Sequence, residues 1–118
     1  MGTAPMPERN RTEGNLPELL DKVVVSIKGV HPNSTVILFG SYARGEQHEN
    51  SDLDICVLVP ELISRRLDME VDARCSLPGG FPLPVDILLY TYDEFEELSK
   101  SKSRLQYKIK NEGVILSA

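Results

Sequence analysis

The stretch VILFGSYARGEQHENSDLDICVLV, residues 36–59, contains two apolar runs separated by a glycine turn and a polar loop. The first run, residues 36–39, has the length and composition of a short buried strand and stops at Gly40 and Ser41. The second run, residues 52–59, alternates between two faces, because successive side chains of a strand point in opposite directions. One face carries Leu53, Ile55, Val57 and Val59, and the other carries Asp52, Asp54, Cys56 and Leu58. We therefore expect a strand, a turn that leads into a short helical segment, a polar loop and a second strand.

Helical patterns flank this stretch on both sides. Residues 16–28 place apolar side chains at three- and four-residue steps, which predicts an amphipathic helix. Residues 61–75 predict a second helix, and the inner face expected for it consists of Leu62, Ile63, Leu67, Val71 and Cys75. The remaining expected elements are a strand at residues 85–90, helices at residues 93–100 and 103–111, and a short apolar tail at residues 114–116.

The order of these elements, α-β-α-β-α-β-α, predicts an α+β fold in which one small sheet is packed by helices. A length of 118 residues suits a single domain, which we expect at residues 16–118. Residues 1–15 are polar and contain prolines and a glycine, so we expect a flexible leader there and no signal peptide.

Composition excludes several classes of protein. No apolar run approaches the roughly 18 residues that a membrane span needs, so we expect a cytoplasmic protein without a membrane segment. Two cysteines, Cys56 and Cys75, do not form a disulfide framework, and Cys56 is expected to be a buried small apolar residue. The formal net charge of −5 argues against a protein that holds duplex nucleic acid through many phosphates.

Gly40 and Ser41 have the properties of a phosphate-binding turn. Glycine allows the backbone to approach a ligand closely, and the first amides of a following helical turn have no partner within the helix. A phosphate accepts hydrogen bonds from such amides and from a serine hydroxyl. The same dipeptide is also common in turns that bind nothing, and the motif alone favours that simpler interpretation.

Asp52 and Asp54 share one face of a strand, with their α-carbons about 6–7 Å apart. Two unpaired carboxylates at that distance repel by roughly 2–3 kcal/mol at an effective dielectric constant near 20. A divalent cation would relieve the repulsion, and Mg²⁺ favours carboxylate oxygens together with substrate phosphates. The alternative is two solvated aspartates at the end of a strand.

Asp86 interrupts the apolar run of the third strand, where a lone carboxylate is costly unless it is paired or binds a metal. The alternative is a charge that protects an edge strand from aggregation. If the second and third strands pair, three carboxylates face the Gly40 turn. Two metal ions about 3.5–4 Å apart use such a layout to hold a triphosphate and an incoming nucleophile in line.

Taken together, the segments GSYARGE (residues 40–46), SDLD (residues 51–54) and VDI (residues 85–87) resemble the motif of the DNA polymerase beta-like nucleotidyltransferase superfamily. The short length resembles its minimal nucleotidyltransferases, which occur beside HEPN-domain proteins. The resemblance covers roughly residue 16 to the C-terminus. It implies a mixed sheet, with Gly40 and Ser41 at the phosphates of the nucleotide.

The resemblance also implies roles for the charged residues. Asp52 and Asp54 would bind both of two Mg²⁺ ions, with Mn²⁺ as a possible substitute, and Asp86 would bind the catalytic ion and help to activate the acceptor hydroxyl. Arg44 matches an arginine of the motif, and it either contacts phosphate or ties the loop to an acidic neighbour. Ser51 is included with the nucleotide-binding residues, although a structural role in capping or orienting the start of the strand is the favoured explanation.

The function implied by the resemblance is transfer of a nucleoside monophosphate, AMP from ATP, onto a hydroxyl of a HEPN-type partner, as the antitoxin of a toxin–antitoxin pair. Two other functions remain open. One is a small-molecule nucleotidyltransferase of the aminoglycoside type that works as a homo-oligomer of two subunits, a dimer that frames the pocket, and the other is an antitoxin that neutralises its partner by binding alone. His31 and His48 are isolated in loops, where we expect solvated side chains. The basic residues between Lys100 and Lys110 are expected to form a solvated helix face, with docking of an acidic partner or a nucleic acid as the alternative.

Overall fold

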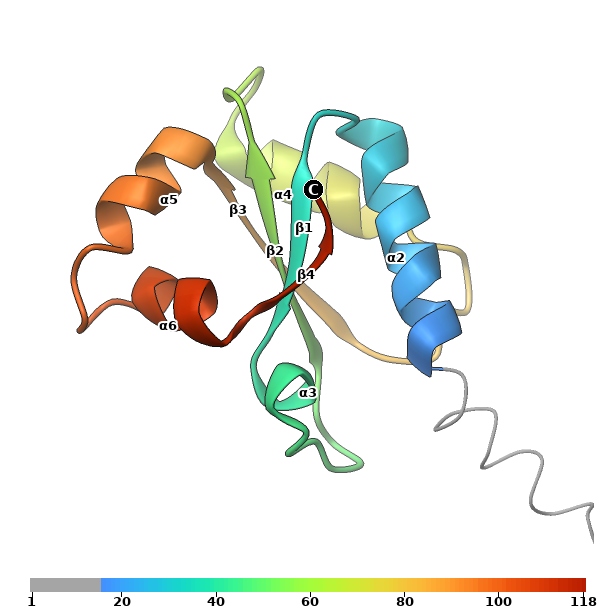
Figure 1. The fold of residues 1–118 in the computed structure, drawn as a ribbon. Coiled ribbons are helices and arrows are strands. Elements are labelled where there is room, and N and C mark those ends of the chain that lie inside the picture. The colour runs from blue at the N-terminus through green and yellow to red at the C-terminus, as the bar shows by residue number, and fades with distance from the viewer. Residues whose placement is uncertain (1–15) are drawn as a thin grey trace, which may run out of the picture.

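The computed structural model describes residues 16–118, and it consists of a four-stranded sheet with helices on both faces (Figure 1). The flexible leader expected at residues 1–15 lies outside the described residues. In chain order the elements are α2 (Leu16–Val30), β1 (Thr35–Phe39), α3 (Ser41–Arg44), β2 (Leu53–Val59), α4 (Arg66–Cys75), β3 (Val85–Thr91), α5 (Tyr92–Leu98), α6 (Leu105–Glu112) and β4 (Val114–Ser117). None of these helices is long and apolar enough to cross a membrane.

The sheet is mixed, which confirms the expected α+β class. Its strand order is β3-β2-β1-β4, with β1 antiparallel to β2 and β4, and β2 parallel to β3. The parallel pair requires a crossover, which α4 provides as it connects β2 to β3. Because β1 and β2 are antiparallel, the carboxyl end of β1 meets the beginning of β2, and the polar loop between them lies at one end of the sheet (Figure 1).

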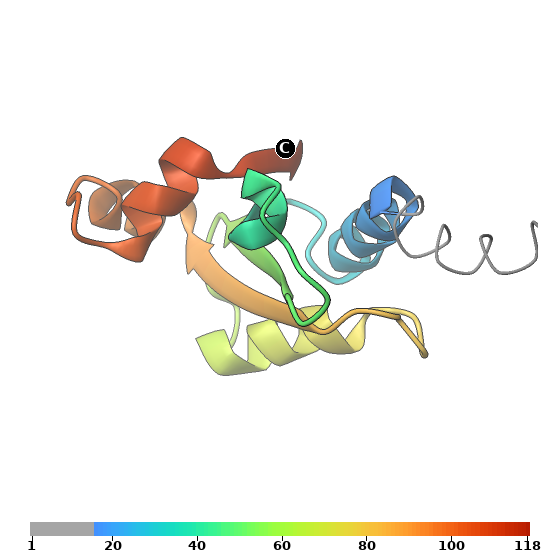
Figure 2. The ribbon, with the colours of Figure 1, turned by 90° about the horizontal axis from the view of Figure 1, so that it is seen from below.

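The two faces of β2 contribute to two different cores, as the alternation of its sequence predicts. Leu53, Ile55, Val57 and Val59 pack with buried residues of α2 and α4. Cys56 and Leu58 point the other way and pack with Phe95 of α5 and Ile109 of α6. Figure 2 shows α4 on one side of the sheet and the α5–α6 pair on the other. Asp54 alternates with the first set, so its side chain projects on the α5–α6 side.

The prediction for α2 is confirmed, whereas that for α4 is wrong in its start and its buried face. The helix begins at Arg66 and not at residue 61. Met69 and Ala73 are its buried residues, while all five side chains of the expected inner stripe reach solvent, including Ile63 and Leu67 at 77% and 63% exposure.

The outer edge of β3 explains why α4 is oriented differently. The backbone N–H of Leu89 donates to Glu70 Oε2 at 2.9 Å, and Arg66 Nη1 donates to the Leu89 carbonyl at 2.9 Å. Edge strands carry unpaired backbone groups, and these two polar side chains of α4 bond to them. The helix therefore turns a partly polar face towards the sheet, which apolar periodicity does not predict.

The C-terminal segment is the second difference from the sequence prediction. The expected apolar tail is the strand β4, which pairs with β1 through Ile37↔Ile115 and Leu38↔Val114. Gly113 precedes it in a crowded position, since a Cβ there would lie 2.5 Å from the Ile109 carbonyl oxygen and 2.7 Å from a methyl group of Ile37. The absence of a side chain at Gly113 lets the chain pass directly from α6 to the sheet.

Glu94 provides a charge-dependent contribution to stability. Thr91 and Glu94 form a capping box at the start of α5, and Arg66 Nη2 lies 2.6 Å from Glu94 Oε2. The hydrogen bonds from Arg66, followed by that from the Thr91 backbone, lower the pKa of Glu94 from 4.5 to about 2. The folded state therefore prefers the carboxylate, and its stabilisation is present above the unfolded pKa and is lost as pH falls through the folded value.

We expect Glu94→Gln to lower the free energy of unfolding at neutral pH by about 1 kcal/mol, a modest value because solvent screens a side chain that is more than a third exposed. Urea denaturation at a series of pH values measures the effect. The difference between wild type and variant should shrink as pH falls from above 4.5 towards about 2. Glu97→Gln, at an exposed ion pair with Lys100, serves as the control and should change little. A difference that persists unchanged at low pH would contradict this account of the charge.

Candidate active site

Gly40 lies where β1 ends, and its backbone conformation excludes other residues. Its φ of 78° and ψ of −156° fall in a region that is essentially restricted to glycine. A Cβ built on Gly40 would collide with Oδ2 of Asp54 and lie 3.0 Å from its Cγ. The Gly40 turn is therefore in direct contact with Asp54, and the sequence had indicated both as candidate site residues.

The pairing of β2 and β3 brings the aspartates together. Asp54 and Asp86 are register partners on these parallel strands, so their side chains project from the same face of the sheet. Asp52 lies just before β2 and is exposed, as is Asp86, whereas Asp54 is half-buried. Burial raises the pKa of Asp54 above its ordinary value, and the charges of Asp86 and then Asp52 raise it further. The three carboxylates therefore form one electrostatic group around Asp54.

A cavity of about 230 Å³ is lined by Asp54, whereas Asp52 and Asp86 do not line it. Phe39, Gly40 and Asp54 line the cavity from the sheet and its turn, and the other lining residues include four from α6. The lining residues from α6 are Leu105, Lys108, Ile109 and Glu112. Their spacing of three and four residues places them on one face of the helix. Sequence patterns alone did not assign these residues to the site, although the spacing could have indicated that they share a face.

The combination of a strand, a glycine turn and paired strand aspartates matches a known family. The model of the Nucleotidyltransferase domain matches residues 20–115. The chain belongs to the nucleotidyltransferase domain family. The resemblance drawn from the short motifs thus extends over most of the chain.

Three proteins of Methanocaldococcus jannaschii, whose names propose that they are protein adenylyltransferases, are similar to part of this chain. The first is 42% identical over 52 residues, which are 44% of this chain and 60% of the relative. The second is 39% identical over 54 residues, 46% and 52% of the two chains. The third is 45% identical over 47 residues, 40% and 47% of the two chains. The similarity thus spans about half the length of these curated relatives.

Two solved structures share the fold. A crystal structure described as a toxin–antitoxin with AMP-PNP superimposes with a TM-score of 0.57 at 24% sequence identity, over 82% of this chain and 71% of that chain. A structure of a proposed nucleotidyltransferase from Sulfolobus solfataricus superimposes with a TM-score of 0.58 at 23% identity, over 88% and 83% of the two chains. At these identities the likeness concerns the fold alone.

The carboxylates at this end of the sheet would suit a magnesium ion brought in by a bound nucleotide. Within residues 16–118, no three His, Cys, Asp or Glu side chains converge closely enough to form a complete metal site from protein groups alone. Mg²⁺, however, commonly takes one or two carboxylates and completes its coordination with water and substrate phosphates. The pair Asp54 and Asp86 suits that arrangement, and the roles of Asp52, Asp54 and Asp86 as metal ligands stay a prediction.

Arg44 is tied to acidic neighbours, one of the two alternatives left open by the sequence. Its Nε lies 3.0 Å from Glu46 Oε1, and its Nη1 lies 3.8 Å from Glu112 Oε1 on α6. The hydrogen bond to Glu46 is the main reason that the pKa of Arg44 is raised. Arg44 nevertheless lines the cavity, so its contact with phosphate stays a prediction.

Ser51 and His48 close the polar loop on itself. The Ser51 hydroxyl accepts from the His48 backbone N–H at 2.9 Å, and the Ser51 N–H donates to the His48 carbonyl at 2.9 Å. Ser51 is buried and does not line the cavity beside Asp54, and neither does Ser41. The visible role of Ser51 is to hold the loop that precedes the aspartates, and nucleotide binding by Ser41 and Ser51 stays a prediction.

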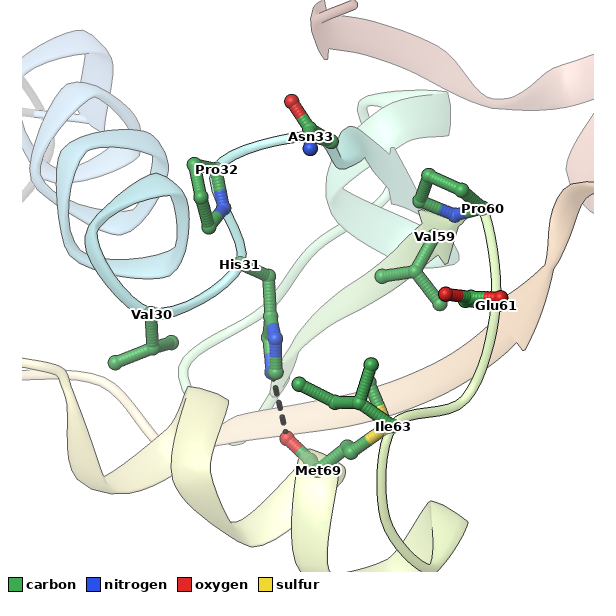
Figure 3. Close-up of a pocket in the computed structure, with 9 residues that line it drawn as sticks. All are labelled: Val30, His31, Pro32, Asn33, Val59, Pro60, Glu61, Ile63 and Met69. Atoms are coloured by element: carbon green, nitrogen blue, oxygen red, sulfur yellow. Dashed lines mark hydrogen bonds between the residues drawn. The ribbon is translucent and has the colours of Figure 1, made fainter.

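The expectation that His31 is solvated is wrong. His31 is 7% exposed, and its Nε2 donates to the Met69 carbonyl of α4 at 3.0 Å, so that it joins the end of α2 to α4 (Figure 3). A hydrogen bond to the carbonyl oxygen supplies what a buried ring needs, and sequence context alone did not indicate it. His31 lines a cavity of about 210 Å³ with Val59 and Pro60, at the end of β2 opposite to Asp54. It therefore has no part in the site at the aspartates.

Proposed function

We propose that this nucleotidyltransferase moves AMP from ATP onto a hydroxyl group of a partner protein. The observation that carries the proposal is the contact between the Gly40 turn and Asp54, next to Asp86 on the neighbouring strand. A phosphate-binding turn set against carboxylates provides the two parts that phosphoryl chemistry needs, a place for the phosphates and a place for a cation. The names of the relatives support a protein as the acceptor, and the AMP-PNP of the structural neighbour supports an adenine nucleotide.

The residues of this chain have separate tasks in the proposed reaction. The backbone amides at the start of α3, after Gly40, bind phosphate oxygens and orient the nucleotide. Mg²⁺ held by Asp52, Asp54 and Asp86 would neutralise phosphate charge and lower the pKa of the acceptor hydroxyl. Asp86 is exposed at the edge strand, where a large acceptor can reach it, and it takes the proton of the hydroxyl. A bond forms from the acceptor oxygen to the α-phosphorus, the bond to the β-phosphate breaks, and pyrophosphate leaves.

We further propose that the acceptor is a HEPN-type toxin and that this chain acts in the cytoplasm as its antitoxin. The described domain is small, and Asp52 and Asp86 are exposed, so a partner protein can supply the acceptor group and the surface around it. The structural neighbour described as a toxin–antitoxin supports a pairing of this kind. The HEPN identity rests on the resemblance of the sequence motifs.

The proposal is tested with ATP labelled at the α-phosphate, incubated with Mg²⁺, the protein and an extract of the cells that produce it. We expect one labelled protein band with the wild type and none with Asp52→Ala, and the mass of the band identifies the acceptor. A label found only on a small molecule would replace the protein acceptor by a small one. Tight binding of ATP without any transfer, in an extract that contains the partner, would instead favour an antitoxin that acts by binding alone.

A further inference from the structure

Helix α6 presents one lysine to the cavity beside Asp54. Leu105, Lys108 and Glu112 lie on the cavity side of the helix, and the orientation of that side is set by Ile109, which is 1% exposed and belongs to the core on the α5–α6 face. Lys108 itself is exposed, so its ammonium group can reach a ligand in the cavity.

The charges around the cavity distinguish Lys108 from Arg44. Arg44 already forms ion pairs with the carboxylates of Glu46 and Glu112. Among residues 16–118, Lys108 has no carboxylate partner within 4.0 Å. Its neighbours in the basic run behave differently, since Lys100 pairs with Glu97 at 3.3 Å and Lys110 pairs with Glu96 at 3.2 Å. Within the described part of the chain, Lys108 is therefore the cation lining the cavity that has no carboxylate partner.

The size and charge of the cavity indicate which anion. A volume of about 230 Å³ is smaller than the roughly 300–1,000 Å³ of pockets that enclose a whole ligand, so it suits part of a nucleotide. A chain with a formal net charge of −5 that places carboxylates at its site repels a triphosphate, and a lysine at the site reduces this repulsion in addition to any Mg²⁺. In the proposed function the aspartates hold the α-phosphate, and Lys108 lines the same cavity as Asp54 but from a different element, α6. A cation placed there meets the phosphates that leave as pyrophosphate.

We propose that Lys108 binds the β- and γ-phosphates of the nucleoside triphosphate, an inference that rests on the proposed function. One residue of the basic run between Lys100 and Lys110 would thereby act at the site, while the other basic residues of the run are exposed to solvent. Lys108 also makes the site select triphosphates over monophosphates, because AMP lacks the groups that Lys108 holds.

The test compares binding of AMP-PNP and AMP by titration calorimetry in the presence of Mg²⁺. We expect Lys108→Met to weaken AMP-PNP binding at least about tenfold, which is the effect of losing a charged hydrogen bond, and to leave AMP binding unchanged. Lys108→Arg should retain most of the affinity. Lys102→Met removes a charge from the same run outside the cavity and should alter neither affinity.

The outcomes separate this inference from the proposed function. If the wild type binds AMP-PNP and Lys108→Met binds it equally well, the role of Lys108 is wrong and the proposed function stands. If Lys108→Met weakens AMP and AMP-PNP equally, Lys108 does not select the outer phosphates. If the wild type binds no triphosphate at all, both proposals fail. Thermal unfolding of each variant shows whether a loss of binding reflects a loss of folding.

Discussion

Replacing Asp54 with Asn is expected to abolish nucleotidyl transfer and to raise the melting temperature. Burial and the charges of Asp86 and Asp52 raise the pKa of Asp54, so its carboxylate is unfavourable in the folded protein without a cation. Asn keeps the shape and removes the charge, which relieves the repulsion. The same change removes a predicted metal ligand, whose cation is worth several kcal/mol of transition-state stabilisation, so transfer should fall at least about a hundredfold.

Turnover assays and thermal unfolding measure the two halves of this prediction. The gain in stability should be largest well above the pKa of Asp54 and should shrink as pH falls, because the wild-type carboxyl then becomes protonated and loses its charge. Asp72→Asn, at an exposed position of α4, is the control and should change neither property appreciably. Wild-type turnover in Asp54→Asn would refute the site, and a lowered melting temperature would refute the charge repulsion.

Replacing Gly40 with Ala is expected to reduce transfer by at least about a hundredfold, the loss that a misplacement of about 1 Å causes in an active site. The new methyl group would occupy the position of the Asp54 carboxylate, so either the turn or the aspartate must move. The glycine-restricted backbone conformation adds a loss of stability of about 1–3 kcal/mol.

Gly45→Ala is the matched control. Gly45 also has a positive φ, 71°, but a Cβ there meets nothing within 4 Å. We expect a loss of stability of about 1–2 kcal/mol from the left-handed backbone and little change in turnover of the folded protein. Turnover assays and urea denaturation of both variants separate strain from collision. Equal turnover losses in the two variants would show that backbone strain, and not the contact with Asp54, explains the effect at Gly40.

Local patterns predicted most elements because they depend on neighbouring residues alone. The three- and four-residue spacing of apolar side chains is sufficient for α2, whose residues Leu19, Val23 and Ile27 are buried. The alternation in β2 correctly assigns Leu53 to one core and Cys56 to the other. In the same way, Gly40 stands out as a turn because a strand-like run stops there.

The wrong predictions for α4, the C-terminal tail and His31 have a common cause. In each case the group that the residues contact lies far away in the sequence. The stripe from Leu62 to Cys75 is apolar at helical spacing, yet α4 turns Arg66 and Glu70 towards the sheet because they bond to the free edge of β3. The tail after Gly113 is short and gives no signal of its own, and it becomes a strand only because β1 offers an open edge. His31 is buried because α4 supplies an acceptor for its ring.

By itself, the sequence of this protein determined its class of fold and the turn at Gly40, and it identified the three aspartates as candidate site residues. These conclusions follow from residue types and short-range periodicity. The tertiary structure alone decided that Asp54 and Asp86 are register partners, that Asp54 touches Gly40, and that Lys108 of α6 faces the same cavity. Those relations depend on strand register and helix orientation. Both are set by burial and hydrogen bonding between elements that are distant along the chain, so short-range patterns do not predict them.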